Sequence, residues 1–283
     1  MRTLLLVLLV IGCAPAGPCR LQQVANLPAT VDAGRLEMTG RVNRVDTQLI
    51  VDTGAERTVL TMSTINELLL ARSRLSRNQL TGVSGAVNNA DVFADLQLGN
   101  ENFAQRFAVT NVPGLHGLIG VDLLGDYDVE LDIPGRRVRL WKPSSCGAND
   151  LPWSGPRSEL PVHMTWNSQL IVTVKIDGKP VNALLDSGAS ISLLQTGTAR
   201  RLGVTQAALA ADPEVSVHGA DGGSINVRIH RFGTVGAGNY QIANPQIGVG
   251  ESQLISPEML LGLDYLRNRR VWISYRAERV FIQ

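Results

Sequence analysis

Two aspartates in closely similar settings are the residues of this sequence best suited to chemistry. They are Asp52 in the run Val51-Asp52-Thr53-Gly54-Ala55 and Asp186 in the run Leu185-Asp186-Ser187-Gly188-Ala189. Two carboxylates held close together cannot both ionise cheaply, so they share a proton and titrate as a coupled pair. One member then serves as a base and the other as an acid. Such a pair can activate a water molecule for attack on a carbonyl group.

The two motifs belong to an internal repeat. Placing Asp52 over Asp186, an offset of 134 positions (186 minus 52), aligns chemically similar residues through 60 and 194. A second block repeats without gaps at an offset of 142, with residues 118–124 over residues 260–266. A single Asp-Thr-Gly is often only a turn. Two copies, each followed by two apolar residues and a glycine, indicate a duplicated domain whose second copy has one longer loop.

The segments around the motifs are rich in strand signals. Residues 170–176 alternate in part with β-branched side chains, Asp177-Gly178 is a hairpin turn signal, and residues 181–185 lead into the aspartate. The sequence therefore predicts a β-hairpin that delivers each carboxylate. Short helices are expected after each motif, over residues 63–74 and 197–202. Asp122 and Asp264 are expected to cap the short helices that follow the later glycines.

These repeated residues resemble the retropepsin-like aspartic peptidases of the pepsin clan. The resemblance covers both copies from about Leu36 to the C-terminus and rests on the Asp-Thr/Ser-Gly-Ala loops and on the later apolar pair with glycine. In that clan each lobe supplies one aspartate, so this chain is similar to a tandem-duplicated, single-chain form. The resemblance implies a mainly β fold of two β-barrel lobes with short helices and an active site at their junction. It also implies an aspartic endopeptidase that acts as a monomer on protein or peptide substrates, with Asp52 and Asp186 as its catalytic residues.

The resemblance also implies roles for the residues beside the dyad. Thr53 and Ser187 occupy the hydroxyl position at which the family cross-links its two loops by hydrogen bonds. Gly54 and Gly188 lack a Cβ, which lets the two loops and a bound water approach closely.

The next residue in each loop, Ala55 or Ala189, stands where some relatives carry a hydroxyl group. A donor there would stabilise the ionised dyad and lower its pKa. Its absence predicts a weakly acidic rather than strongly acidic optimum.

The family also carries a flap, a glycine-bearing hairpin tip that closes over the substrate. The candidate tips start 30 and 33 positions after their respective aspartates, at residues 82 and 219. The candidate residues are Gly82, Val83, Ser84 and Gly85 in the first copy, and Gly219, Ala220, Asp221 and Gly222 in the second. Because glycine is common at any hairpin tip, this assignment depends on the equivalent spacing in the two copies.

Size and composition agree with a two-lobed globular protein. The chain has 283 residues, of which 44% are hydrophobic and 18% charged, and its net charge is +1. This balance leaves no electrostatic footprint for nucleic acid. The four histidines, His116, His163, His218 and His230, are scattered, so we expect neither a metal site nor a cofactor.

The first residues predict an export signal. One arginine precedes an apolar run that is too short to span a bilayer. The run ends in Val10-Ile11-Gly12-Cys13, which resembles the bacterial lipobox and predicts lipidation of Cys13. This interpretation places the protein in the cell envelope, anchored to a membrane by lipid and facing the periplasm. An ordinary signal peptide cut after Ala14-Pro15-Ala16 is the alternative.

Cys19 and Cys146 are the remaining cysteines and are either paired in a disulfide or free thiols. The stretch from Lys142 to Pro161 is rich in proline and glycine and reads as a linker. The expected domains are a signal peptide (1–12), a tether (13–34), an N-terminal lobe (35–142), the linker (143–160) and a C-terminal lobe (161–283).

Two noncatalytic functions remain as alternatives. One is a tethered lipoprotein that binds peptides or proteins and retains the dyad without cleaving. The other is an envelope scaffold. Intact motifs in both copies disfavour them, because a binding module has no need of two close carboxylates that destabilise each other.

Overall fold

The computed structural model describes residues 21–82, 85–142, 151–219, 223–253 and 257–283. Strands dominate these segments, so the prediction of a mainly β fold is confirmed. Within the described segments, no helix is both long and apolar enough to cross a membrane.

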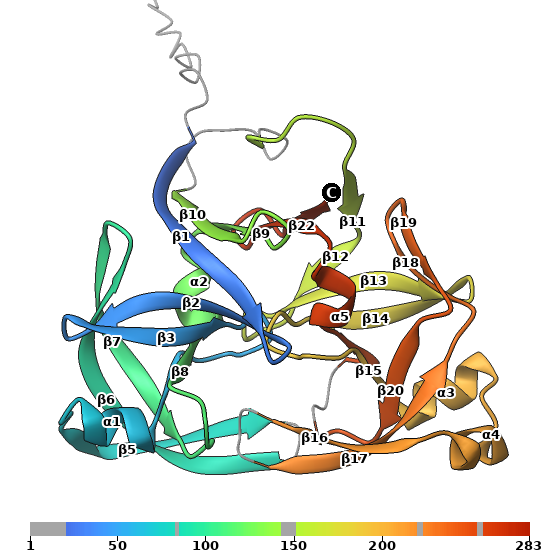
Figure 1. The fold of residues 1–283 in the computed structure, drawn as a ribbon, viewed down its shortest axis with the longest axis horizontal. Helices are drawn as coiled ribbons and strands as arrows, with labels where there is room; N and C mark the ends of the chain where they lie inside the picture. The colour runs from blue at the N-terminus through green and yellow to red at the C-terminus, as the bar shows by residue number, and fades with distance from the viewer. Residues whose placement is uncertain (1–20, 83–84, 143–150, 220–222, 254–256) are drawn as a thin grey trace, which may run out of the picture.

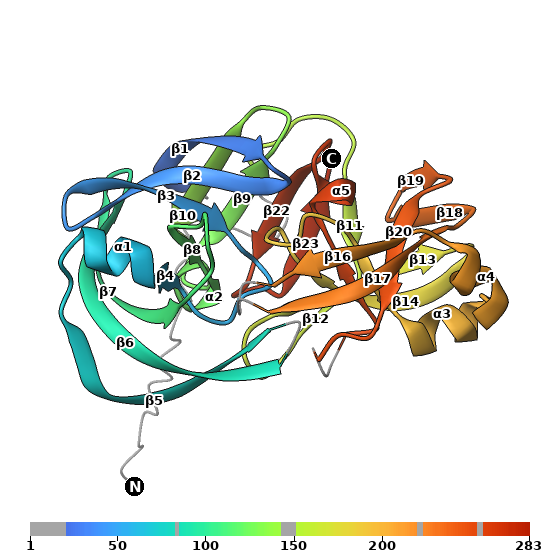
Figure 2. The ribbon, with the colours of Figure 1, turned by 60° about the horizontal axis from the view of Figure 1, so that its bottom comes forward.

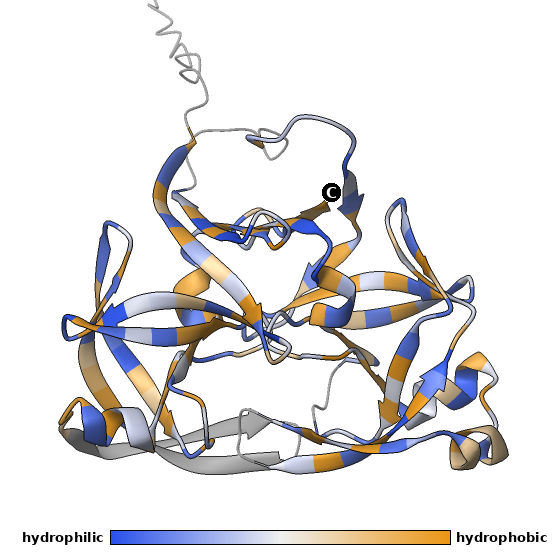
Figure 3. Ribbon diagram, in the orientation of Figure 1, coloured by the Kyte–Doolittle hydropathy of each residue, from blue (hydrophilic) through white to orange (hydrophobic). Residues whose placement is uncertain are grey.

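The first repeat forms a closed six-stranded barrel. The strands of this repeat are β1 (Gln22–Asp32), β2 (Arg35–Val42), β3 (Val45–Val51), β4 (Val59–Thr61), β5 (Arg72–Gly82), β6 (Gly85–Leu98), β7 (Glu101–Thr110), β8 (Gly117–Ile119), β9 (Asp128–Asp132) and β10 (Arg137–Lys142), and six of them form the barrel. Neighbouring strands run in the order β2-β3-β8-β4-β7-β6, and a pairing of β2 with β6 closes the ring. Alternate side chains of β2 are buried, and the strands are striped in Figure 3 because successive residues face opposite sides of a sheet.

The second repeat forms a separate ten-stranded sheet. Its strands run in the order β16-β17-β20-β15-β21-β14-β13-β18-β19, with β12 beside β13. The strands of this half are β11 (Ser158–Leu160), β12 (Val162–Met164), β13 (Leu170–Ile176), β14 (Lys179–Leu185), β15 (Leu193–Gln195), β16 (Glu214–His218), β17 (Ser224–Arg231), β18 (Thr234–Ala237), β19 (Tyr240–Ala243), β20 (Gln246–Gly250), β21 (Met259–Leu261), β22 (Arg270–Ser274) and β23 (Arg279–Ile282).

The two repeats are joined by six strands that pair in the order β11-β23-β22-β9-β10-β1, which we call the joining sheet. At its centre β9 runs antiparallel to β22, and Glu130 lies opposite Trp272. These two residues are 142 positions apart, which is the offset of the repeat. The two copies therefore meet across an approximate twofold axis. Figure 1 shows this joint between the first repeat (blue to green) and the second (yellow to red).

The joining strands differ from the expected domain limits. Residues 22–32, expected in the tether, form β1, and residues 158–160, expected in the linker, form β11. Both strands pair with strands at the ends of the repeats, β1 with β10 and β11 with β23. Cys13, Cys19 and Cys146 lie outside the described residues.

The helices are short. They are α1 (Met62–Glu67), α2 (Val121–Leu124), α3 (Thr196–Leu202), α4 (Gln206–Ala211) and α5 (Leu263–Leu266). The prediction of a helix over residues 63–74 is wrong beyond Glu67. Leu69 adopts a positive φ of 53° and is 90% exposed. Its side chain therefore does not contribute to the core, although its position fits the apolar period. The predicted helix over 197–202 is confirmed as α3, which ends at Gly203 in the left-handed conformation.

Two hairpins extend toward the middle of the molecule from opposite sides. The pair β5–β6 comes from the first repeat and the pair β16–β17 from the second, on the side away from the joining sheet (Figures 1 and 2). The residues at the junction of the repeats therefore have the joining sheet on one side and these hairpins on the other.

Candidate active site

Each candidate aspartate follows a buried strand that pairs in parallel with a later strand of its own repeat. In the first copy β3 pairs with β8, the N–H of Asp52 donates to the carbonyl of Ile119 at 3.0 Å, and the N–H of Val121 donates to Ala55 at 2.8 Å. The second copy makes the same bonds, from Asp186 to Leu261 at 3.1 Å and from Leu263 to Ala189 at 2.8 Å. The two loops are therefore fixed in matching positions by their own repeats.

Within each loop the carboxylate accepts two backbone hydrogen bonds. Oδ1 of Asp52 accepts from the N–H groups of Gly54 at 2.9 Å and Ala55 at 3.0 Å. Oδ1 of Asp186 accepts from Gly188 at 3.0 Å and Ala189 at 2.9 Å. The two carboxyl groups lie close enough for the charge of Asp186 to raise the pKa of Asp52. The structure thus brings together the two residues that the sequence singled out as a dyad.

The loop glycines allow this close approach. A Cβ built on Gly54 would lie 2.6 Å from Cγ of Asp186, and one on Gly188 would overlap the carboxyl group of Asp52. Each glycine therefore packs against the aspartate of the other repeat. Any side chain here would push the two carboxyl groups apart.

The hydroxyl groups of Thr53 and Ser187 cross-link the loops. Oγ1 of Thr53 donates to the carbonyl of Leu185 at 2.6 Å and accepts from the N–H of Ser187 at 3.0 Å. Oγ of Ser187 donates to Val51 at 2.6 Å and accepts from the N–H of Thr53 at 3.1 Å. All four bonds are buried, so they hold the relative position of the two aspartates with little competition from water.

The predicted caps Asp122 and Asp264 have a different role. Gly120 and Gly262 are the N-caps of α2 and α5, and neither makes a side-chain capping bond. The carboxylate of Asp122 instead accepts from the N–H of Thr58 at 2.8 Å and from its hydroxyl at 2.7 Å.

The second copy repeats this arrangement with Asp264, which accepts from the N–H and hydroxyl of Ser192 at 2.9 and 2.6 Å. Thr58 and Ser192 in turn accept from the N–H groups of Gly120 and Gly262 at 3.1 and 3.0 Å. The prediction that these aspartates are the N-caps is therefore wrong. Their carboxylates hold the end of each dyad loop against the following helix, and that of Asp264 also accepts from the N–H of Tyr265 in α5 at 2.8 Å.

The dyad is buried, with Asp52 8% and Asp186 9% exposed. Burial and the facing Asp186 carboxylate raise the pKa of Asp52 well above its usual range. Burial also raises the pKa of Asp186, although the hydrogen bonds from Ala189, Gly188 and Asp52 oppose the rise. The pair therefore keeps a shared proton at pH values at which ordinary aspartates are ionised.

These raised pKa values predict that stability depends on pH. The native dyad binds more protons than the unfolded chain at pH values between the ordinary carboxyl pKa, about 4, and the raised values. The free energy of unfolding should therefore fall as the pH rises through that window. The Asp52→Asn variant has no ionisable group at position 52, so its free energy of unfolding should fall less over the same pH range. Denaturant titrations of both proteins between pH 4.5 and 8 measure the difference, and parallel pH profiles would contradict it.

The candidate flaps lie on the two central hairpins. Gly82 ends β5 and pairs with Gly85 at the start of β6, while Val83 and Ser84 lie outside the described residues. In the second repeat the N–H of Gly219 donates to the carbonyl of Gly223 at 2.9 Å. Ala220, Asp221 and Gly222 lie outside the described residues. A hairpin thus leads to each candidate tip, and the role of the tips stays a prediction.

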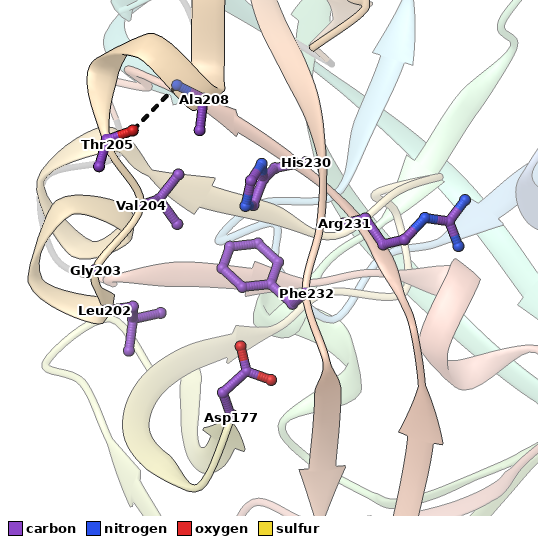
Figure 4. A pocket seen from close by; sticks show the side chains of 9 residues that line it. All are labelled: Asp177, Leu202, Gly203, Val204, Thr205, Ala208, His230, Arg231 and Phe232. Carbon is purple, nitrogen blue, oxygen red and sulfur yellow. Dashed lines mark hydrogen bonds between the residues drawn. The ribbon is translucent and has the colours of Figure 1, made fainter. Parts of the chain in front are cut away.

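A pocket of about 290 Å³ lies on the outer part of the second repeat (Figure 4). It is bordered by α3, α4 and the end of β17, and Phe232 packs edge-on against His230 within it. The imidazole of His230 is held by Asp212 at 2.6 Å. None of the residues lining this pocket belongs to the dyad loops, so its position does not connect it to the chemistry of the two aspartates.

Contacts between the repeats at the dyad loops were missed by the sequence reasoning. In the turn between β12 and β13, the side-chain amide of Gln169 donates to the carbonyl of Gly54. The side-chain amide of Asn167 donates to the carboxylate of Glu56. The partners are more than a hundred positions apart, and no local pattern indicates such pairing.

Each repeat matches a family model of aspartyl proteases. Residues 172–265 match the aspartyl protease model, and residues 38–126 match the gag-polyprotein aspartyl protease model. Each repeat thus resembles an aspartyl protease domain. The matched segments contain one candidate catalytic aspartate each, Asp186 and Asp52. No curated protein matches the sequence.

The whole fold also has a solved counterpart. The crystal structure of Basic 7S globulin from soybean is similar with a TM-score of 0.51, over 93% of this chain and 95% of that chain. At 12% sequence identity this likeness shows the fold alone. Because unrelated functions recur on one fold, the function has to be argued from the dyad.

Proposed function

We propose that this chain is an aspartic endopeptidase that hydrolyses peptide bonds with Asp52 and Asp186. The observation that carries the proposal is the pair of buried, adjacent carboxyl groups whose loops are held together by the four cross-linking bonds of Thr53 and Ser187. Two buried acids held against each other cost stability, and such arrangements cluster at catalytic sites. The aspartyl protease matches of both repeats support the same reaction class.

The proposed mechanism uses the shared proton. The ionised aspartate accepts a proton from a water molecule as the water oxygen attacks the peptide carbonyl carbon. The protonated aspartate donates toward the developing oxyanion, and a tetrahedral intermediate forms. As the intermediate collapses and the C–N bond breaks, the aspartate that took the water proton passes it to the leaving amine. A hydroxyl proton of the intermediate returns to the other aspartate as the product carboxyl forms, so the dyad is again singly protonated. No covalent enzyme intermediate is required.

The pH optimum follows from the loop composition. Ala55 and Ala189 offer no side-chain hydroxyl to the dyad, and burial raises the pKa of both aspartates. Cleavage should therefore peak at weakly acidic pH, above the ordinary carboxyl pKa of about 4. A kcat/KM profile against pH measures this. A peak below about pH 3 would contradict the account.

A transition-state mimic tests the proposal against its noncatalytic alternatives. The probe is a peptide in which a hydroxyl-bearing, non-hydrolysable group replaces the scissile bond. It should inhibit cleavage and raise the Tm of the wild type, and the shift should shrink in Asp186→Asn. A noncleaving binder would gain stability equally from an ordinary peptide, and a scaffold would respond to neither. Either result would reject the peptidase.

We propose further that the protein is exported and lipid-anchored at Cys13 in the cell envelope, facing the periplasm. The apolar run and the Val10-Ile11-Gly12-Cys13 sequence support this proposal. Mass spectrometry of the mature N-terminus tests it. A lipid-modified Cys13 is expected, and an unmodified start at Gly17 would overturn the proposal.

A further inference from the structure

The turn between β12 and β13 is a second feature of the junction between the repeats. It comprises Thr165, Trp166, Asn167, Ser168 and Gln169. The N–H of Thr165 donates to the carbonyl of Gln169 at 2.9 Å, and the N–H of Ser168 donates back to Thr165 at 3.0 Å. The hydroxyl of Thr165 accepts from the N–H of Gln169 at 3.1 Å. These bonds within the turn fix its conformation.

The same turn is anchored to the first dyad loop. The side-chain amides of Gln169 and Asn167 donate to Gly54 and Glu56, which stand two and four positions after Asp52. The other repeat makes the equivalent approach, because a Cβ on Gly34 in the β1–β2 turn would lie 2.8 Å from Cβ of Ser190. Ser190 is four positions after Asp186. Each dyad loop is therefore bordered by a turn of the opposite repeat.

Trp166 is the anomalous residue of this turn. It is 93% exposed, although the turn that carries it is fixed and lies against the dyad loop. The other three tryptophans lie together at the joining sheet, where Trp153 and Trp272 are buried and Trp141 packs on Trp272 with ring centroids 5.8 Å apart. A single exposed leucine is ordinary on a protein surface. An exposed indole on a turn that is fixed in place offers a large apolar face to a binding partner.

The equivalent position in the other repeat is chemically different. At the offset of 134, Trp166 corresponds to Asp32, the last residue of β1 before the β1–β2 turn. The turn beside the first dyad loop thus carries an exposed aromatic ring, and the chain beside the second dyad loop carries an exposed carboxylate. A substrate lying across the dyad would meet two unlike surfaces.

We propose that Trp166 is a specificity-determining residue that binds an apolar or aromatic side chain of the substrate, on the side of the scissile bond held by the first dyad loop. This inference rests on the proposed peptidase function. The indole face would cover the substrate side chain and remove apolar surface of both groups from water. The hydrogen bonds of Asn167 and Gln169 fix the backbone that carries the ring, so little backbone conformational entropy is lost on binding.

Cleavage-site profiling on a mixed peptide library tests the proposal. We compare the wild type with Trp166→Ala, Trp166→Phe and the control Leu69→Ala, which removes an equally exposed apolar side chain beside α1. Trp166→Ala should lower kcat/KM about tenfold or more for peptides with an apolar residue at the recognised position. Peptides with aspartate there should change by less than about twofold. Trp166→Phe should retain the preference, and Leu69→Ala should match the wild type.

A second measurement separates this inference from the peptidase function. Binding of the transition-state mimic should protect Trp166 from fluorescence quenching by acrylamide, and Trp166→Ala should lose that protected signal. If the wild type cleaves but Trp166→Ala keeps its profile, the inference fails and the peptidase proposal stands. If nothing is cleaved but peptides still protect Trp166, the peptidase proposal fails and peptide binding by Trp166 is supported. Cleavage without protection of Trp166 would also overturn the inference.

Discussion

Asp52→Asn and Asp186→Asn should each lower kcat/KM for peptide hydrolysis by about 10³-fold or more, because each removes one partner of the proton transfer. Asparagine has nearly the same shape as aspartate, and its side-chain oxygen can still accept the backbone N–H bonds of its loop. It cannot accept a proton from water or share one with the other carboxylate. The double variant should be little worse than either single one, because the two residues act as a unit.

The matched control for this experiment is Asp46→Asn. Asp46 lies on β3, the same strand that leads into Asp52, but its carboxylate is exposed and pairs with Arg41 at 2.8 Å. This substitution should leave kcat/KM within about twofold of the wild type, since exposed ion pairs contribute little. Circular dichroism and Tm confirm that each variant is folded. Full activity in either dyad variant would contradict the assigned roles.

Glu130→Gln should cause the largest loss of stability, about 3 kcal/mol in the free energy of unfolding. Glu130 is fully buried in β9, opposite Trp272 at the centre of the joining sheet. Oε1 accepts from Arg139 at 2.9 Å and from Nε of Arg270 at 2.7 Å. The indole N–H groups of Trp153 and Trp141 donate to the two carboxylate oxygens, each at 3.1 Å.

The cost arises from the groups left behind. Without the carboxylate charge, Arg139 and Arg270 remain partly buried, with side-chain exposures of 19% and 28%. Glu159→Gln is the control, because Glu159 pairs with Arg279 at 2.5 Å near the surface, where such pairs contribute less than about 1 kcal/mol. Chemical denaturation measures both variants. Equal losses would show that the Glu130 cluster does not specially stabilise the joint between the repeats.

The dyad was predictable because its signal is local and occurs twice. The residues around Asp52 and Asp186 determine loop geometry through their immediate neighbours, and the duplication supplied the second partner. The strand that delivers each aspartate was predictable for the same reason. The β-hairpin leading to Asp186, for example, is present as β13 and β14 with Asp177 and Gly178 at its turn.

Other features depend on contacts between distant segments and left no local pattern. Asp122 stands where a helix cap is common, but its partner Thr58 is 64 positions away. Glu130 is an ordinary acid in a strand until Arg270, 140 positions later, is brought beside it. Leu69 fits a helical apolar period, yet the chain turns outward there with positive φ before β5 begins. Tertiary packing overrides local propensity in each case.

The repeat predicted equivalent strands but not their mutual pairing. Residues 129 and 131 align with residues 271 and 273, yet in the sheet Val129 faces Ile273 and Leu131 faces Val271. An approximate twofold axis between antiparallel strands produces this exchange. The same axis places each turn beside the opposite dyad loop, which explains why the contacts of Asn167 and Gln169 could not be read from either copy alone.

The central claim is tested most directly by digesting a mixed peptide library with the purified protein in ¹⁸O-water at weakly acidic pH. Mass spectrometry then identifies every new peptide end. The account predicts internal cleavages whose new carboxyl groups carry one solvent oxygen, and predicts that the double variant Asp52→Asn/Asp186→Asn produces none of them. The absence of new ends with the wild type at every pH between about 3 and 7, a range that brackets the carboxyl pKa values, or their persistence in the double variant, would contradict it.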